Sequence, residues 1–362
     1  MPNTPQLQSA VTEQFANASS GQTASRRALG LVPGLAAAVA LAFVATIAGD
    51  HFRVIGAPVF AIVGGMLLSV VIPKNTVLQP GVSFSSKSVL KGSIIVLGTG
   101  LSFHEVVVTG VSSLPVLLGT LVIALASAWL LGRWLLIESD LTTLIGVGTA
   151  ICGASAIAAT DAVISASESD VSYAITTIFF FNVAAVLTFP MLGHLMHLSS
   201  HTFGLWSGTA VNDMSSVVAA SSVYSKAAAS FAVIVKLTRT LMIIPITIGI
   251  ASLRARRARV GAPSNTGPSR ISTLRRVFPV FIIWFLVAVL ANSMGFISHA
   301  WHADLSLLAA FMISVALGAI GMSSNFGEIR KMGARPLLMG GALWVLVSVS
   351  SLGLQLATTH LA

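Results

Sequence analysis

Long apolar stretches alternate with short polar connections along almost the whole chain. We expect each of these stretches to be a helix, because most are close to the roughly 20 residues that an α-helix needs to cross a bilayer. Their boundaries are accurate to about three residues. There are eleven, numbered here as segments one to eleven: 30–49, 55–72, 89–103, 113–136, 141–166, 172–195, 202–224, 228–252, 277–294, 304–323 and 336–358. The pattern predicts an all-α, polytopic membrane protein with about ten or eleven transmembrane segments.

Composition supports a membrane protein over a soluble one. Apolar residues make up 55% of the chain and charged residues 9%. Soluble domains carry about a quarter charged residues, so a soluble chain this apolar could not cover its own surface. Residues 1–28 are rich in Ser, Thr, Gln and Asn, and we expect a disordered polar tail there. The remaining residues, 29–362, then form one transmembrane domain.

The positive charge of the chain gives its orientation. Most of the net charge of +9 comes from a basic loop, 253–276, which lies between two apolar segments. It carries Arg254, Arg256, Arg257, Arg259, Arg270, Arg275 and Arg276. The positive-inside rule makes this loop and the N-terminus cytoplasmic. The same bias holds if segments five and seven both cross or both re-enter, and it fails if only one of them does. No aromatic residues interleave with the Arg run, so we expect the lipid bilayer as a partner and no nucleic acid.

A short motif occurs twice, once in segment five (148–159) and once in segment seven (208–220). The two copies align at an offset of 60 residues, with Thr149 opposite Thr209, Cys152 opposite Asn212, Gly153 opposite Asp213 and Ser155 opposite Ser215. Close packing of helices through small residues would explain one such segment. Two matching Gly-interrupted segments with polar residues indicate instead the binding site of a transporter. A helix broken inside the membrane leaves N–H groups free at one half-helix start, and these groups attract anions.

A second, looser repeat relates residues 100–119 to residues 321–340. Each copy begins with a Gly followed by a short polar stretch that ends in Glu, namely Glu105 and Glu328. An odd number of predicted crossings separates the copies. We therefore expect inverted repeats.

Segment eight carries two charges in the middle of an apolar run. Lys236 and Arg239 are three residues apart and share one face of a helix. Charges at this depth need a counter-charge, a cavity or a substrate. Asp213 is the expected counter-ion, or else a site for a coupling proton or cation, and Asp161 is a second candidate for that site. Lys226 lies at the segment's start, where it can reach the membrane surface.

Other chemistry finds little support in the sequence. Cys152 is the only cysteine, which excludes an intrachain disulfide. His194, His197 and His201 lack the further ligands of a metal site and fit a membrane-interface cluster better. No nucleophile elbow, phosphate loop or zincin motif occurs, so we expect neither an enzyme, nor a metal, nor a cofactor.

Four pieces of the sequence together resemble a known family. They are residues 148–160, 209–220, 235–239 and 333–339. The chain from about residue 30 to 358 resembles the YeiH-type family of conserved bacterial membrane proteins, which are described as sulfate exporters. This resemblance implies an inner-membrane transporter built from inverted repeats. Some members have a His–acidic pair where this chain has Asn212 and Asp213, so the resemblance does not extend to an imidazole proton carrier.

These observations favour a secondary transporter that moves a small anion, sulfate or a small sulfonate, by alternating access. The expected substrate-binding residues are Thr149, Cys152, Gly153, Ser155, Thr209, Asn212, Ser215, Ser216, Lys236 and Arg239, with Asp213 and Asp161 for a coupling proton or cation. One alternative is a cation–proton antiporter with Asp213 as the carrier. Another is a membrane receptor or scaffold without transport. A homodimer would suit an inverted-repeat transporter.

Overall fold

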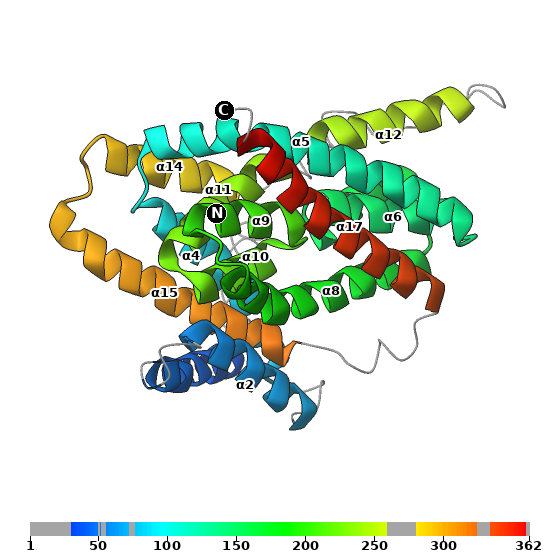
Figure 1. Cartoon of the computed structure of the whole chain (residues 1–362). Coiled ribbons are helices and arrows are strands. Elements are labelled where there is room, and N and C mark those ends of the chain that lie inside the picture. The colour runs from blue at the N-terminus through cyan, green and yellow to red at the C-terminus, as the bar shows by residue number, and fades with distance from the viewer. Residues whose placement is uncertain are drawn as a thin grey trace, which may run out of the picture. The chain divides into compact units, whose positions relative to one another are not determined.

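The computed structural model describes residues 30–49, 51, 56–71, 77–258, 280–323 and 334–359 (Figure 1). Every regular element in these ranges is a helix. After the first helix, Gly30–Gly49, they are α2 (Ala57–Val71), α3 (Gln79–Phe84), the π-helix η1 (Ser85–Val89), α4 (Leu90–Gly98), α5 (Phe103–Trp134), α6 (Ser139–Ala150), α7 (Ala154–Ile164), α8 (Glu168–Leu195), α9 (Ser200–Ala210), α10 (Met214–Tyr224), α11 (Lys226–Thr240), α12 (Ile243–Ala258), α14 (Phe281–Ser293), α15 (His299–Met322) and α17 (Ala334–Thr359).

Helix length and surface chemistry confirm an all-α, polytopic membrane protein. Six helices of the described chain are long and apolar enough to cross a bilayer: Gly30–Gly49, α5, α8, α11 with α12, α15 and α17. Their outer faces carry large apolar side chains. On α5, for example, Val122, Trp129 and Leu130 are at least 60% exposed. Such a surface is stable in lipid and not in water.

Segment four begins earlier than its hydropathy predicts. We expected His104 and Glu105 in a connection, but both lie in the first turn of α5. Ser102 caps this helix by accepting a hydrogen bond from the backbone N–H of Glu105, and the Glu105 carboxylate accepts one from the backbone N–H of Ser102. This reciprocal capping box gives a polar stretch a defined helix start.

The chain divides into two compact units. The smaller unit comprises Met1–Leu90 and Phe311–Ser324. Within it, a cluster around Ala38, Val82 and Ala319 forms a core. The first helix contacts α3 very closely, because a Cβ on Gly34 would lie 2.0 Å from the carbonyl oxygen of Leu78. Only a glycine permits that distance. The polar tail 1–28 and most of the basic loop lie outside the described residues; within the loop, 253–258 continue α12.

The larger unit comprises Lys91–Ala310 and Asn325–Ala362, and it contains segments five and seven. Each of these segments consists of two short helices separated by three non-helical residues. We name α6, residues 151–153 and α7 hairpin A, and we name α9, residues 211–213 and α10 hairpin B. The three non-helical residues of each are called its tip, and the opposite end is called its base. The arms of the two hairpins keep the offset of 60 residues, because α7 begins at Ala154 and α10 at Met214.

Both hairpins return to the end at which they start. At the base of hairpin A, Arg254 contacts both Asp140 in the first turn of α6 and the carbonyl oxygen of Ile164 at the end of α7. At the base of hairpin B, the hydroxyls of Ser200 and Ser225 lie 2.9 Å apart. Sequence alone left open whether these segments cross or re-enter, and these contacts show that both turn back.

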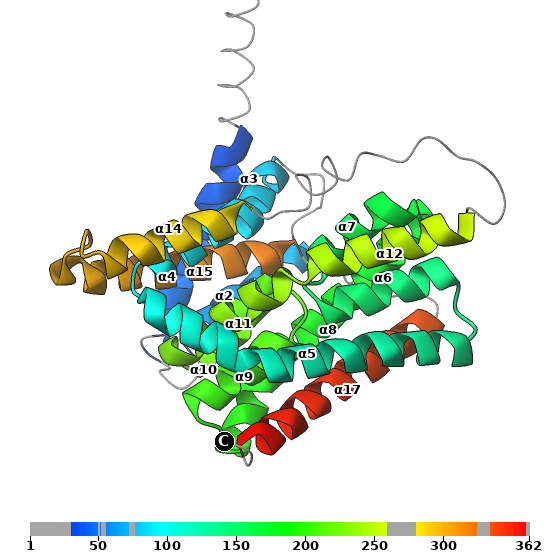
Figure 2. The ribbon, with the colours of Figure 1, turned by 90° about the horizontal axis from the view of Figure 1, so that it is seen from above.

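The two hairpins have their bases at opposite ends of the larger unit (Figure 2). Helix α8 connects the base of hairpin A to the base of hairpin B, and its 28 residues span about 42 Å at 1.5 Å per residue. Helices α11 and α12 then run back to the base of hairpin A. Their path is interrupted at Leu241 and Met242, just before Pro245, which cannot donate a helical hydrogen bond.

The larger unit retains part of the second, looser repeat. Its first copy, 100–119, runs from the turn before α5 into that helix, whereas residues 324–333 in the middle of its second copy lie outside the described residues. The inverted repeats therefore stay a prediction.

Candidate functional site

The tips of the two hairpins meet inside the larger unit. Gly153 in tip A has φ +68° and ψ −132°, a conformation that strains any residue with a side chain. A Cβ at this position would also lie 3.3 Å from the Cβ of Asp213 in tip B. Glycine thus serves two purposes here: it allows the sharp reversal of the chain, and it allows close contact between the tips.

Two buried cations on α11 hold the first arm of each hairpin. Lys236 and Arg239 are both 0% exposed. The Lys236 ammonium donates a hydrogen bond to the carbonyl oxygen of Val211, 2.8 Å away at the end of α9. Arg239 Nε donates to the carbonyl oxygen of Ala150, 2.6 Å away at the end of α6. A helix C-terminus carries partial negative charge and free carbonyls, so each cation stabilises a helix end that would otherwise be unsatisfied in the protein interior.

Several buried polar atoms at the tips have no hydrogen-bond partner among the described residues. They are Nη1 and Nη2 of Arg239, Oγ1 of Thr149 and Oδ1 of Asn212. Buried polar groups are paired in the great majority of cases, and an unpaired one calls for a physical reason such as a bound ion or water. A buried guanidinium with two unpaired donor groups carries a large free-energy penalty, which a bound hydrogen-bond acceptor would reduce.

Asp213 does not pair directly with the two cations. In the described part of the chain no carboxylate oxygen lies within 4.0 Å of Lys236 or Arg239, although Asp213 is near enough to Lys236 for an electrostatic interaction. Asp213 is instead the N-cap of α10, and its carboxylate accepts hydrogen bonds from the backbone N–H and the hydroxyl of Ser215. Here the structure differs from our expectation of a direct counter-ion, because the carbonyl dipoles of α6 and α9 occupy that place.

Asn182 on α8 completes the tip of hairpin B, and the sequence analysis did not identify it. Its side-chain oxygen accepts hydrogen bonds from the backbone N–H groups of Asn212 and Asp213, at 3.1 and 3.2 Å. The residue is only 4% exposed. It directly follows three phenylalanines, 179–181, in an apolar run. A lone amide in such a run is the signal that could have revealed it, since a buried amide needs partners.

The remaining expected site residues divide into two groups. Cys152 and Gly153 lie in tip A, and Ser155, Ser215 and Ser216 lie in the first turns of the second arms. Thr209 is turned away from the tips, because its hydroxyl bonds to the carbonyl of Leu205 and lies 2.6 Å from the Ser351 hydroxyl on α17.

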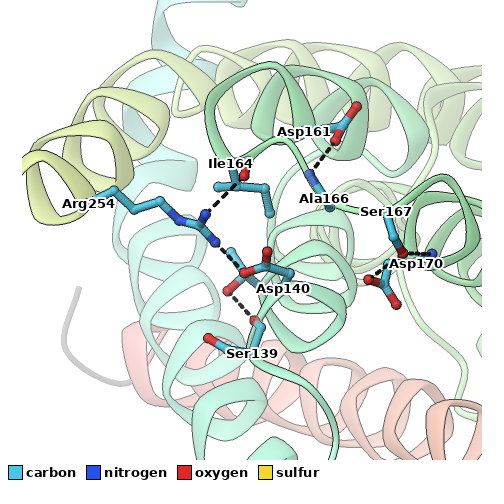
Figure 3. A network of polar contacts seen from close by, with 9 residues as sticks. Ser139, Asp140, Asp161, Ile164, Ala166, Ser167, Asp170 and Arg254 are labelled. Atoms are coloured by element: carbon cyan, nitrogen blue, oxygen red, sulfur yellow. Dashed lines mark hydrogen bonds and ion pairs between the residues drawn. The ribbon is translucent and has the colours of Figure 1, made fainter. Parts of the chain in front are cut away.

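Asp161 is also remote from the tips. It lies in the last turns of α7, and its carboxylate accepts a hydrogen bond from the backbone N–H of Ala166 at 3.0 Å (Figure 3). This contact belongs to the base of hairpin A. The same view shows Arg254 reaching from α12 to Asp140 and to the carbonyl of Ile164, 2.9 Å from Nη1. Asp161 therefore helps to close the turn between α7 and α8.

Comparison with known proteins identifies relatives that cover nearly the whole chain. A family model described as Conserved hypothetical protein 698 matches residues 33–340, which include both hairpins. A UPF0324 membrane protein of Streptococcus pyogenes is 40% identical over 334 residues, covering 90% of this chain and 97% of the relative. A UPF0324 membrane protein of Streptococcus pneumoniae is 42% identical over 330 residues, covering 89% and 96%.

A third relative shows that the similarity extends beyond streptococci. A UPF0324 membrane protein of Clostridium tetani is 41% identical over 312 residues, covering 84% of this chain and 90% of the relative. No solved structure matches the chain. With its apolar helices and these relatives, the chain is a multi-pass membrane protein that belongs to the family of Conserved hypothetical protein 698.

Proposed function

We propose that this protein is a secondary active transporter of a small oxyanion, either sulfate or a small sulfonate. The observation that carries the proposal is the buried Lys236–Arg239 pair at the meeting point of the two tips. Each charge at such depth costs at least about 2.5 kcal/mol on insertion scales. Two carbonyl oxygens offset part of this cost, but a positive charge remains without a carboxylate beside it. An anion in the same place removes that excess charge.

The arrangement of the hairpins suits alternating access. Their bases lie at opposite ends of the larger unit and their tips meet inside it. Separation of one base from its neighbours would open a path to the tips from one end only. Because Arg239 is fully buried, an anion can reach it only after such a movement. The resemblance to sulfate exporters suggests outward transport across a bacterial inner membrane, with the N-terminus in the cytoplasm.

Asp213 is the residue that we propose for coupling to a proton or cation. Its half-buried carboxylate lies in tip B, within electrostatic range of Lys236. Neutralising this carboxylate would leave the two cations less well balanced and would strengthen their attraction for an anion. Asp161 is less suited, since its carboxylate belongs to the base of hairpin A.

Transport of radiolabelled sulfate in proteoliposomes tests the proposal. We expect Lys236→Met and Arg239→Met each to abolish sulfate flux. Lys226→Met is the matched control, because it removes the same charge from the exposed start of the same helix. Elution of each variant as a single symmetric peak from size-exclusion chromatography would establish that it is folded. Normal sulfate flux by a folded Arg239→Met variant would contradict the proposal.

A cation–proton antiporter is the second candidate, and it is favoured by the Asp213 carboxylate in tip B, which lies within electrostatic range of the buried Lys236 without pairing with it. In that case Lys236 and Arg239 would have only a structural role. Proteoliposomes with an internal pH dye separate the two functions. Proton movement that depends on Na⁺, that needs no anion and that disappears in Asp213→Asn would favour the antiporter.

A further inference from the structure

The two tips differ in how their free N–H groups are used. In tip B, the backbone N–H groups of Asn212 and Asp213 donate to the Asn182 amide, and that of Ser215 donates to the Asp213 carboxylate. The helix start at α10 is thus filled by oxygen atoms of the protein, one of them charged. A carboxylate at a helix N-terminus neutralises the partial positive charge there and repels other anions.

Tip A has no such acceptor at the start of its second helix. Gly153 is the N-cap of α7, and no side chain caps this helix. The N–H groups of Ala154 and Ser155 have no partner within the helix and no acceptor elsewhere in the described ranges. Ala154 and Ser155 are both exposed residues, whereas Cys152 and Gly153 before them are buried.

Buried polar groups adjoin the same tip. Arg239 Nε bonds to the carbonyl of Ala150, the last residue of α6 before tip A. The two Nη atoms of this guanidinium and Thr149 Oγ1, one residue before Ala150, are buried without partners in the described part of the chain. Tip A therefore combines an open helix N-terminus with an uncompensated cation.

We infer that the transport site is one-sided: a single oxyanion binds at the N-terminal turn of α7, in the field of Arg239, and hairpin B binds none. Asn182 acts as a positioning residue. Its amide oxygen accepts hydrogen bonds from two backbone N–H groups of tip B, which would otherwise be free to bind the anion in competition with tip A. This inference rests on the proposed anion transport, and it specifies which of the two hairpins binds the anion. The hydroxyl of Ser155 is a further donor at this turn.

Proline substitution can delete one backbone donor at each tip. Ala154 and Met214 occupy the same first helical position in the two hairpins, 60 residues apart. Proline is well tolerated at this position, because its fixed φ suits a helix start and its missing N–H breaks no helical bond. Ala154→Pro removes a donor from tip A, and Met214→Pro is the matched control in tip B.

The measurement is calorimetric titration of the full-length protein in detergent with sodium sulfate, against sodium chloride at equal ionic strength. We expect one sulfate per wild-type chain. Ala154→Pro should raise the dissociation constant about ten- to a hundredfold, as expected for loss of a hydrogen bond to a charged ligand. Met214→Pro should leave it within about twofold of wild type, since tip B makes no contact with the anion. Two sulfates per chain, or weakening by Met214→Pro alone, would overturn the inference.

A second pair of variants covers the case in which a proline variant does not fold. Ser155→Asp places a negative charge at the first turn of α7, where it suits the helix and repels an anion. The asparagine of Ser155→Asn has nearly the same shape as this aspartate but carries no charge. We expect sulfate binding to be lost in Ser155→Asp and weakened much less in Ser155→Asn, because the amide of asparagine keeps a hydrogen-bond donor at this turn. Equal sulfate affinity of the two variants would show that the anion does not bind at the N-terminal turn of α7. If sulfate binds the wild-type protein but the variants contradict the location at α7, only this inference fails. If sulfate does not bind the wild-type protein at any pH, the proposed anion transport fails as well.

Discussion

At the scale of single residues, position within the fold decides what a charge does. Lys226 and Lys236 belong to the same helix, α11, yet the first is exposed and the second fully buried. Burial alone would make Lys236 strongly destabilising. The carbonyl of Val211 accepts its hydrogen bond, and the C-terminal dipole of α9 favours its charge. The same reasoning applies to Arg239 at the end of α6.

Asn182 permits a test of stability at this scale. Asn182→Leu keeps a similar volume but leaves the backbone N–H groups of Asn212 and Asp213 buried without an acceptor. Each buried unsatisfied donor costs about 1–3 kcal/mol, so we expect a clear fall in the unfolding temperature in detergent. Asn182→Asp keeps an acceptor oxygen and should unfold closer to wild type. A Leu variant as stable as the wild-type protein would show that these hydrogen bonds contribute nothing.

At the scale of helices, α11 and α12 fix hairpin A at both of its ends. Arg239 bonds to the last residue of α6 at the tip, and Arg254 bonds to both arms at the base. The side chains of Arg254 and Asp140 are 42% and 33% exposed, so their ion pair is weak and can break. Opening of this base would expose tip A from one end of the larger unit.

Cys152 reports such an opening without the introduction of another cysteine. It is 4% exposed and is the only cysteine of the chain. We expect Arg254→Met and Asp140→Asn each to speed its modification by N-ethylmaleimide about two- to fivefold, in keeping with a partly exposed ion pair of up to about 1 kcal/mol. The readout is the mass of the intact protein over time.

Two comparisons make this labelling experiment specific. Arg133→Met is the matched control, because the guanidinium of Arg133 lies over the ring of Trp129 at 5.0 Å and not on hairpin A. Combining Arg254→Met with Asp140→Asn should add little to either single change, since both remove the same ion pair. Additive effects would mean that the two residues act separately.

At the scale of the molecule, the hairpins give the larger unit two chemically different ends. Arg133 and Arg254 lie at the end where hairpin A has its base. From the positive-inside rule we therefore predict that this end faces the cytoplasm and that the base of hairpin B faces the opposite side. Had only one of the two segments re-entered, Arg133 and Arg254 would fall on opposite sides of the membrane.

Site-directed labelling checks this orientation. In a Cys152→Ser background, a cysteine is introduced at Ser167, beside the base of hairpin A, or at Ser199, beside the base of hairpin B. We expect a membrane-impermeant maleimide added to intact cells to label Ser199→Cys and not Ser167→Cys. Cells made permeable should show labelling of both. Labelling of both variants in intact cells would contradict the opposite placement of the two bases.

Sequence by itself determined the properties that depend on local composition. Apolar runs of helix-crossing length predicted the all-α membrane fold, and the burial cost of a charge singled out Lys236 and Arg239. The position of the repeated motifs predicted where segments five and seven are interrupted, because glycine and polar residues disrupt a membrane helix locally. These features need no knowledge of distant contacts.

Only the tertiary structure decided which groups meet. Arg239 bonds to a carbonyl 89 residues away and Asn182 to N–H groups 30 and 31 residues away. Hydropathy has no information on such pairings, so it could not show that both segments turn back, that the cations cap helix C-termini, or that Asp161 belongs to the base of a hairpin. Packing of α8 and α11 against the hairpins fixes these contacts, because in a dry interior each free backbone group must find a partner wherever the fold provides one.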